Sequence, residues 1–217
     1  MRNSPLNRAL PALTLVALTV SGCSSSDGGK DTPAGATASQ VCGGFAKDPA
    51  VGSALVAVVG EDRLLDDRSE AETTVRALRS SDGKLTLKEL GSGSPFCVLK
   101  NADDGEQALR IEFREAVTID GTRDTATFSY FSTGEMSLSS DRFAKLQFNC
   151  VMKSPTKKVI VTASLSREGN TATVTAASLP VRQVTVLNAA ARKMSTALGC
   201  TNDTKLVTGV PAAYGRG

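Results

Sequence analysis

The chain has 217 residues and a formal net charge of +3; 41% of its residues are hydrophobic and 22% are charged, which is typical of a globular domain. It contains neither histidine nor tryptophan, and only 4% of its residues are aromatic. This composition excludes histidine-dependent catalytic dyads and triads and imidazole-bound metals, and it disfavours stacking platforms for bases or sugars.

The amino terminus has the layout of an export signal. Arg2 and Arg8 form a short positive region, followed over residues 9–20 by an apolar run too short to span a bilayer as a permanent helix. The run leads into Val20-Ser21-Gly22-Cys23, which resembles the lipobox of bacterial lipoproteins. We therefore expect residues 1–22 to be a lipoprotein signal peptide and Cys23 to be the lipidated first residue of the mature chain. The alternative is an ordinary signal peptide followed by a coincidental cysteine.

Cleavage at this point would change the charge balance. Residues 1–22 carry two arginines and no acidic residue, so their removal lowers the net charge from +3 to +1. A nucleic-acid partner needs a concentrated positive face, and we expect none here. The expected partner is the membrane, reached through the lipid on Cys23, which would hold the protein at the extracytoplasmic face of the cell membrane.

A polar segment separates this region from the rest of the chain. Residues 23–40 are rich in serine, glycine, alanine and threonine and show no apolar periodicity, which is typical of a flexible tether. Periodic patterning begins at Val41. We expect residues 41–217 to form a single α+β domain, because about 175 residues are enough for one hydrophobic core.

The domain opens with two helical patterns. Asp48 and Pro49 are typical of a helix start, Gly60 is typical of a helix end, and Ser69-Glu70-Ala71-Glu72 has the pattern of a capping box that opens a second helix. Strand-like runs then follow over residues 94–100, 107–118, 123–133, 143–152, 157–167 and 171–177. Hairpin turns are predicted between these runs at Asp104-Gly105, Asp120-Gly121 and Gly169-Asn170.

The last helix is predicted to begin at Pro180 and to end at Gly199. Its apolar stripe consists of Val184, Leu187, Ala191, Met194 and Leu198. Arg192 and Lys193 lie in its later turns, where the helix dipole favours cations. Helices at both ends of a run of hairpin-linked strands predict an α+β fold, in which an antiparallel sheet of about six strands is covered by the N- and C-terminal helices.

Four cysteines remain in the expected mature domain: Cys42, Cys97, Cys150 and Cys200. An even number in an exported chain favours two disulfides, whereas structural zinc sites usually use closely spaced cysteine pairs that are absent here. Three pairings are open. Cys97-Val98-Leu99-Lys100 and Cys150-Val151-Met152-Lys153 each open a hairpin with one associated helix, and two such similar units would pair Cys42 with Cys97 and Cys150 with Cys200.

Candidate catalytic groups are few. Two Ser-x-x-Lys matches, Ser81 to Lys84 and Ser154 to Lys157, have the spacing of a serine/lysine nucleophile pair, but Asp82-Gly83 and Pro155 indicate turns instead of the helix that this chemistry needs.

Charged groups cluster in predicted turns, where solvated charge is the usual explanation. Lysines gather around one hairpin, and they would suit an acidic lipid or an anionic cell-wall polymer. The acidic clusters are Glu61-Asp62, Asp66-Asp67 and Asp103-Asp104-Glu106, and the basic one is Lys153, Lys157 and Lys158. We expect no catalytic residue, no cofactor and no metal site.

As a whole, the chain resembles the small cysteine-framed lipoproteins of actinobacteria. The resemblance lies in the Val20–Cys23 lipobox, the Cys42-Gly43-Gly44 segment before a helix, Cys97, and a terminal helix that ends at Gly199-Cys200. It implies a lipid-anchored envelope protein, with a fold similar to PsbP-like α+β sandwiches, and it carries no catalytic residues to transfer.

Two functions from different classes are compatible with these features. We expect a non-catalytic module, not an enzyme, that binds an envelope protein, a cell-wall component or a small ligand, or that serves a structural role. The alternative is a cell-wall-directed hydrolase that uses carboxylates or a Ser/Lys pair, which would require those groups to converge.

Overall fold

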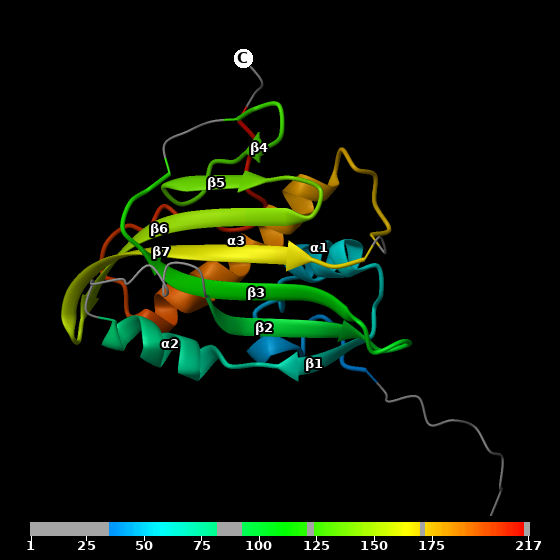
Figure 1. Ribbon diagram of the computed structural model, residues 1–217, viewed down its shortest axis with the longest axis horizontal. Helices are drawn as coiled ribbons and strands as arrows, with labels where there is room; N and C mark the ends of the chain where they lie inside the picture. The colour runs from blue at the N-terminus through cyan, green and yellow to red at the C-terminus, as the bar shows by residue number, and fades with distance from the viewer. Residues whose placement is uncertain (1–34, 82–92, 121–123, 170–171, 215–217) are drawn as a thin grey trace, which may run out of the picture. The chain divides into compact units, whose positions relative to one another are not determined.

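A computed structural model describes residues 35–81, 93–120, 124–169 and 172–214. The expected signal peptide, 1–22, and the expected lipidation site, Cys23, lie outside these residues. The described chain forms a seven-stranded sheet, antiparallel at every pairing, in the order β1-β2-β3-β7-β6-β5-β4 (Figure 1). The α+β class predicted from the sequence is therefore confirmed.

The elements follow one another along the chain with helices before and after the long strands. The strands are β1 (Leu64–Arg68), β2 (Ser94–Asn101), β3 (Gln107–Ala116), β4 (Ser129–Tyr130), β5 (Met136–Ser139), β6 (Phe143–Lys153) and β7 (Thr156–Arg167). The helices are the 3-10 turn η1 (Cys42–Gly44), α1 (Pro49–Val59), α2 (Ala71–Ser80) and α3 (Leu179–Leu198).

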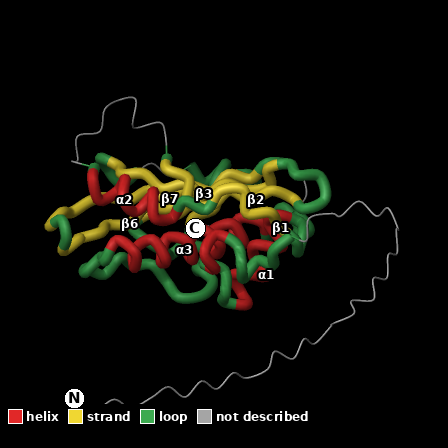
Figure 2. Tube along the Cα trace, turned by 90° about the horizontal axis from the view of Figure 1, so that it is seen from below, coloured by secondary structure: helices red, strands yellow, loops and turns green. Residues whose placement is uncertain are grey.

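The helices α1 and α3 lie together on one face of the sheet (Figure 2). Buried and half-buried residues alternate along β3, as expected for a strand with only one face on the core. Phe113 from β3 packs edge-to-face against Phe96 from β2, with ring centroids 5.4 Å apart, and Phe96 meets Phe45 at 5.8 Å. The opposite face carries ion pairs such as Arg110–Glu112, at 2.5 Å.

Two disulfides join distant parts of this core. They link Cys42 to Cys97 and Cys150 to Cys200, with Cα–Cα distances of 5.4 and 5.0 Å. These are the pairings that the similarity of the two hairpin units favoured. The first attaches η1 to β2, and the second attaches Cys200, two residues beyond the C-terminal end of α3, to β6.

The helix boundaries follow mainly from local signals. Asp48 caps α1 by accepting the Ala50 backbone N–H at 2.8 Å, and Gly60 and Gly199 end α1 and α3 in the left-handed conformation, as predicted. The predicted capping box at Ser69 is wrong, because the cap residue of α2 is Glu70, which makes no side-chain capping bond.

The strand and hairpin predictions need correction at several points. The described part of 123–133, residues 124–133, contributes the two-residue β4 and an isolated bridge at Phe131, and the described part of 171–177 forms bends and a turn. β1 and β5 were not predicted from the sequence. Gly121 and Asn170, from the two other expected hairpin turns, lie outside the described residues; among the described strands β3 has β2 and β7 as its neighbours, and β7 has β3 and β6, so neither turn joins two paired strands.

Each edge of the sheet is met by one end of the described chain. At the β1 edge, Ala36 forms an isolated antiparallel bridge with Leu64, with N–O distances of 2.8 and 2.9 Å. At the β4 edge, the Ser132 N–H donates to Ala212 O at 2.8 Å, and the Tyr214 N–H donates to Tyr130 O at 2.9 Å. The fold thus includes residues that the predicted boundary at Val41 had assigned to the tether.

Candidate functional site

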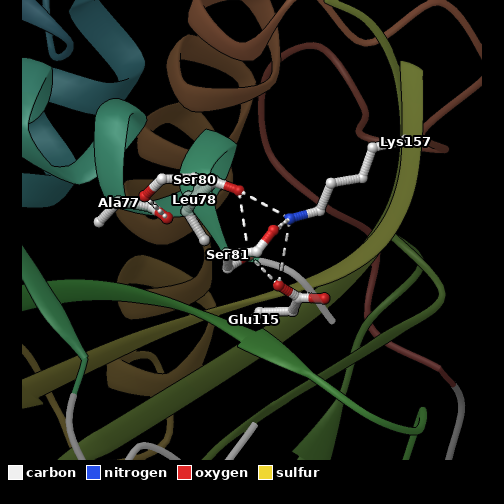
Figure 3. A network of polar contacts seen from close by, with 6 residues as sticks. All are labelled: Ala77, Leu78, Ser80, Ser81, Glu115 and Lys157. Atoms are coloured by element: carbon white, nitrogen blue, oxygen red, sulfur yellow. Dashed lines mark hydrogen bonds and ion pairs between the residues drawn. The ribbon is translucent and has the colours of Figure 1, made fainter. Parts of the chain in front are cut away.

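The structure brings together one residue from each of the two Ser-x-x-Lys matches. Ser81, at the C-terminal end of α2, meets Lys157 of β7 and Glu115 of β3 (Figure 3). The Lys157 Nζ donates to Ser81 Oγ at 2.6 Å and lies 3.5 Å from Glu115 Oε2, while Ser81 Oγ also contacts that carboxylate. Ser81 and Lys157 belong to different matches and are 76 residues apart in the chain, and Lys84 lies outside the described residues.

This network caps the C-terminal end of α2. The Lys157 Nζ also donates to the backbone carbonyls of Ser81 and Leu78, the latter at 3.3 Å, and these are carbonyls that the helix itself leaves unsatisfied. An ammonium has three N–H donors, and four acceptors surround this one. The Lys157 Nζ is thus engaged by acceptors that belong mainly to one helix end: two backbone carbonyls, the Ser81 hydroxyl and the Glu115 carboxylate. The geometry therefore favours a capping role over nucleophile activation.

The carboxylates of the acidic clusters are engaged in local structure, and Glu61 lies near enough to Asp103 and Asp104 to sense their charges. Asp66 accepts the Cys42 backbone N–H at 2.8 Å, and Asp67 pairs with Lys100 at 2.8 Å. Asp104 accepts the Glu106 N–H at 2.8 Å across the hairpin turn between β2 and β3. All three residues are exposed, as predicted for solvated charge, and their carboxylates in addition make these local contacts.

Glu61 is the acidic residue whose titration responds to this clustering. Partial burial raises its pKa first, and the negative charges of Asp103 and Asp104 raise it further. Over residues 35–81, 93–120, 124–169 and 172–214, no group of three or more histidine, cysteine, aspartate or glutamate residues is placed to hold a metal ion.

The three lysines of the basic patch predicted at the β6–β7 hairpin do not all face the solvent. Lys153 and Lys158 are exposed, whereas Lys157 turns inward to the end of α2 and is only 15% exposed. The described patch therefore offers two cations instead of three.

A polar cleft of about 350 Å³ lies between the N-terminal part of α1 and the C-terminal half of α3. Sequence reasoning did not identify it, because its walls come from three segments far apart in the chain. Its lining residues are Gly44, Phe45, Asp48, Val51, Asn188, Ala189, Arg192, Lys193, Ser195, Thr196, Thr204, Leu206 and Gly209.

A buried network fixes the third wall of this cleft. The Thr133 hydroxyl donates to Asn188 Oδ1 at 2.6 Å and accepts the Val207 N–H at 3.3 Å, and Asn188 Nδ2 donates to Val207 O at 2.8 Å. Asn188 is 1% exposed and Thr133 is 2% exposed. Because these bonds are shielded from water, they hold the segment that carries Leu206 against α3.

A second, more open hollow of about 580 Å³ runs along the other side of α1. It is lined by small residues of α1 and by Thr37, Ala38, Ser39, Asp62, Arg63 and Thr173, among others. Its lining is mostly apolar.

No helix of the described residues is both long enough and apolar enough to cross a membrane. No family model, curated protein or solved structure matches this chain.

Proposed function

We propose that this protein is a lipid-anchored, extracytoplasmic module of the cell envelope whose α+β domain binds a ligand or partner without catalysing a reaction. The observation that carries the proposal is the pair of disulfides, Cys42–Cys97 and Cys150–Cys200. It is joined to the sequence prediction of an export signal over residues 1–22 and of a lipobox-like pattern at Val20–Cys23. Disulfides form and persist in oxidising compartments, which agrees with export.

The arrangement of the described residues supports binding more than catalysis. The Ser81–Lys157–Glu115 network is occupied in closing α2, whereas the cleft between α1 and α3 presents charged and polar groups on a fixed frame. Small-ligand sites typically combine a concave shape with a few such polar groups.

The anchor is tested by expressing the full chain in a bacterial host, separating membrane from soluble fractions, and measuring the intact mass of the product. We expect cleavage before Cys23, a lipid mass on that residue, and recovery with the membrane. C23S should lose the lipid mass, whereas S24A should keep it. An unmodified amino terminus, or four reduced thiols in the domain of the exported protein, would contradict the proposal.

One observation favours the alternative of a cell-wall hydrolase, namely the convergence of Ser81, Lys157 and Glu115. In that reading Ser81 would be the nucleophile and Lys157 its base. Release of soluble fragments from purified cell wall that disappears in S81A, with the fold intact, would establish the hydrolase in place of the binding module.

A further inference from the structure

The cleft between α1 and α3 presents an excess of positive charge. Arg192 and Lys193 from α3 line one wall, and Asp48 is the acidic residue of the lining. Asp48 already serves α1, because its Oδ1 accepts the Ala50 N–H at 2.8 Å. The lining of the cleft therefore has two cationic side chains and one carboxylate, and that carboxylate caps α1.

Arg192 has its guanidinium available for a ligand. It is exposed, and within the described residues neither a hydrogen bond nor an ion pair engages its side chain; only its backbone carbonyl is used, as acceptor for Ser195 and Thr196. Its planar fork of N–H donors matches the two oxygens of a carboxylate or phosphate.

Lys193 is held beside it by the η1 turn. Its Nζ donates to the Gly43 carbonyl, and a Cβ at position 43 would lie 2.9 Å from that nitrogen. Gly43 also has a φ of +67°, which favours glycine. The ammonium is thus fixed at the cleft, with donors to spare beyond the one that the carbonyl accepts.

From this arrangement we infer that the cleft binds a small oxyanion, a phosphate or carboxylate group, through Arg192 and Lys193. The volume of about 350 Å³ fits a small molecule and lies near the lower end of ligand pockets. The Thr133–Asn188–Val207 network fixes the facing wall before any ligand arrives, which lowers the ordering cost of binding. The inference deepens the proposed binding role, by naming a ligand class, but it does not depend on the anchor.

The experiment titrates detergent-solubilised full-length protein with inorganic phosphate and, separately, with acetate, at constant ionic strength. Binding is measured by calorimetry and by NMR of the arginine side-chain N–H groups. We expect a saturable isotherm and a shift of the Arg192 resonance. R192Q should weaken binding about tenfold, as expected for the loss of a charge-assisted hydrogen bond.

The matched control is R182Q, which removes the same charge from α3 at a residue outside the cleft lining. It should bind as the wild type does. Equal weakening in R182Q and R192Q would mean unspecific attraction to the helix and would overturn the inference, as would the absence of saturable binding of either anion. The stronger of the two anions identifies the group. Because the lipid mass on Cys23 is measured separately, failure here leaves the anchor proposal standing.

Discussion

Glu135, immediately before β5, joins the sheet to the C-terminal segment through one carboxylate. Its Oε2 accepts Lys205 Nζ at 2.7 Å, and its Oε1 accepts Asn149 Nδ2 at 3.0 Å. The hydrogen bond from Lys205 lowers the pKa of Glu135 most, followed by the one from Asn149. The folded state therefore favours the ionised carboxylate.

This shift predicts how Glu135 contributes to stability with pH. Since its folded pKa lies below the ordinary value of 4.5, its stabilising contribution is present above that value and is lost as the pH falls through the lower, folded-state pKa. We expect E135Q to lower the free energy of unfolding at neutral pH and the difference from wild type to shrink towards acid. Urea unfolding across this pH range measures it, with exposed Glu106 changed to Gln as control. A difference that stays constant with pH would contradict the assignment.

For single residues, Ser81 and Lys157 show how far the sequence could predict the candidate site. The sequence could predict local features of these residues, but not their contact with each other. It indicated that each Ser-x-x-Lys match lies in a turn, and Ser81 does follow the last turn of α2. It could not indicate that the serine of one match meets the lysine of the other, because only the pairing of β3 with β7 brings these segments together. The sequence likewise predicted that Arg192 and Lys193 are cations of the last helix, but it could not predict that they line a cleft.

Among the elements, α2 depends on β7 for its C-terminal end. We expect K157M to lower the free energy of unfolding by about 2 kcal/mol, because it leaves helix carbonyls and the buried Glu115 without their cationic donor. Amide hydrogen exchange in the last turn of α2 should also become faster. K158M, at the neighbouring exposed lysine, is the control and should stay within about 0.5 kcal/mol of wild type. Equal effects of the two variants would contradict the capping role.

Helices were easier to predict than strands for a physical reason. α1 and α3 carry their own stop signals, Gly60 and Gly199, and an apolar stripe, all of which act within one element. β1 has the sequence LLDDR, which shows no alternation, and β5 has only four residues, so both depend on neighbouring strands. Residues 171–177 had the composition of a strand, but both sides of β7 are already occupied by β3 and β6.

For the whole molecule, the sequence predicted the class and the presence of disulfides but not the order of strands. Hairpins such as β2–β3 and β6–β7 follow from local turns. The central pairing of β3 with β7 joins residues about fifty positions apart, and no local pattern specifies such a partner. The cleft depends on the same long-range assembly.

The covering of the sheet edges predicts the effect of a truncation. Ending the chain after Val210 removes the segment that pairs with Tyr130 and Ser132, at about 1 kcal/mol for each lost hydrogen bond, and leaves the β4 edge open to another copy. We expect a lower melting temperature and concentration-dependent self-association, measured by size-exclusion chromatography with light scattering. A chain that ends after Tyr214 keeps these bonds and is the control. If the shorter chain stays monomeric at every concentration, the segment after Val210 does not prevent self-association through the β4 edge.

The two disulfides also determine how the domain would carry mechanical load. Tension on the amino end first opens the bridge between Ala36 and Leu64 at the β1 edge, then reaches Cys42 and passes through the disulfide to β2. Tension on the carboxyl end reaches Cys200 and passes to β6 in the same way. Once the contacts of Ala36 with β1 and of residues 212–214 with Tyr130 and Ser132 have opened, a pull on both ends is borne by the four strands between these cross-links, β2, β3, β7 and β6.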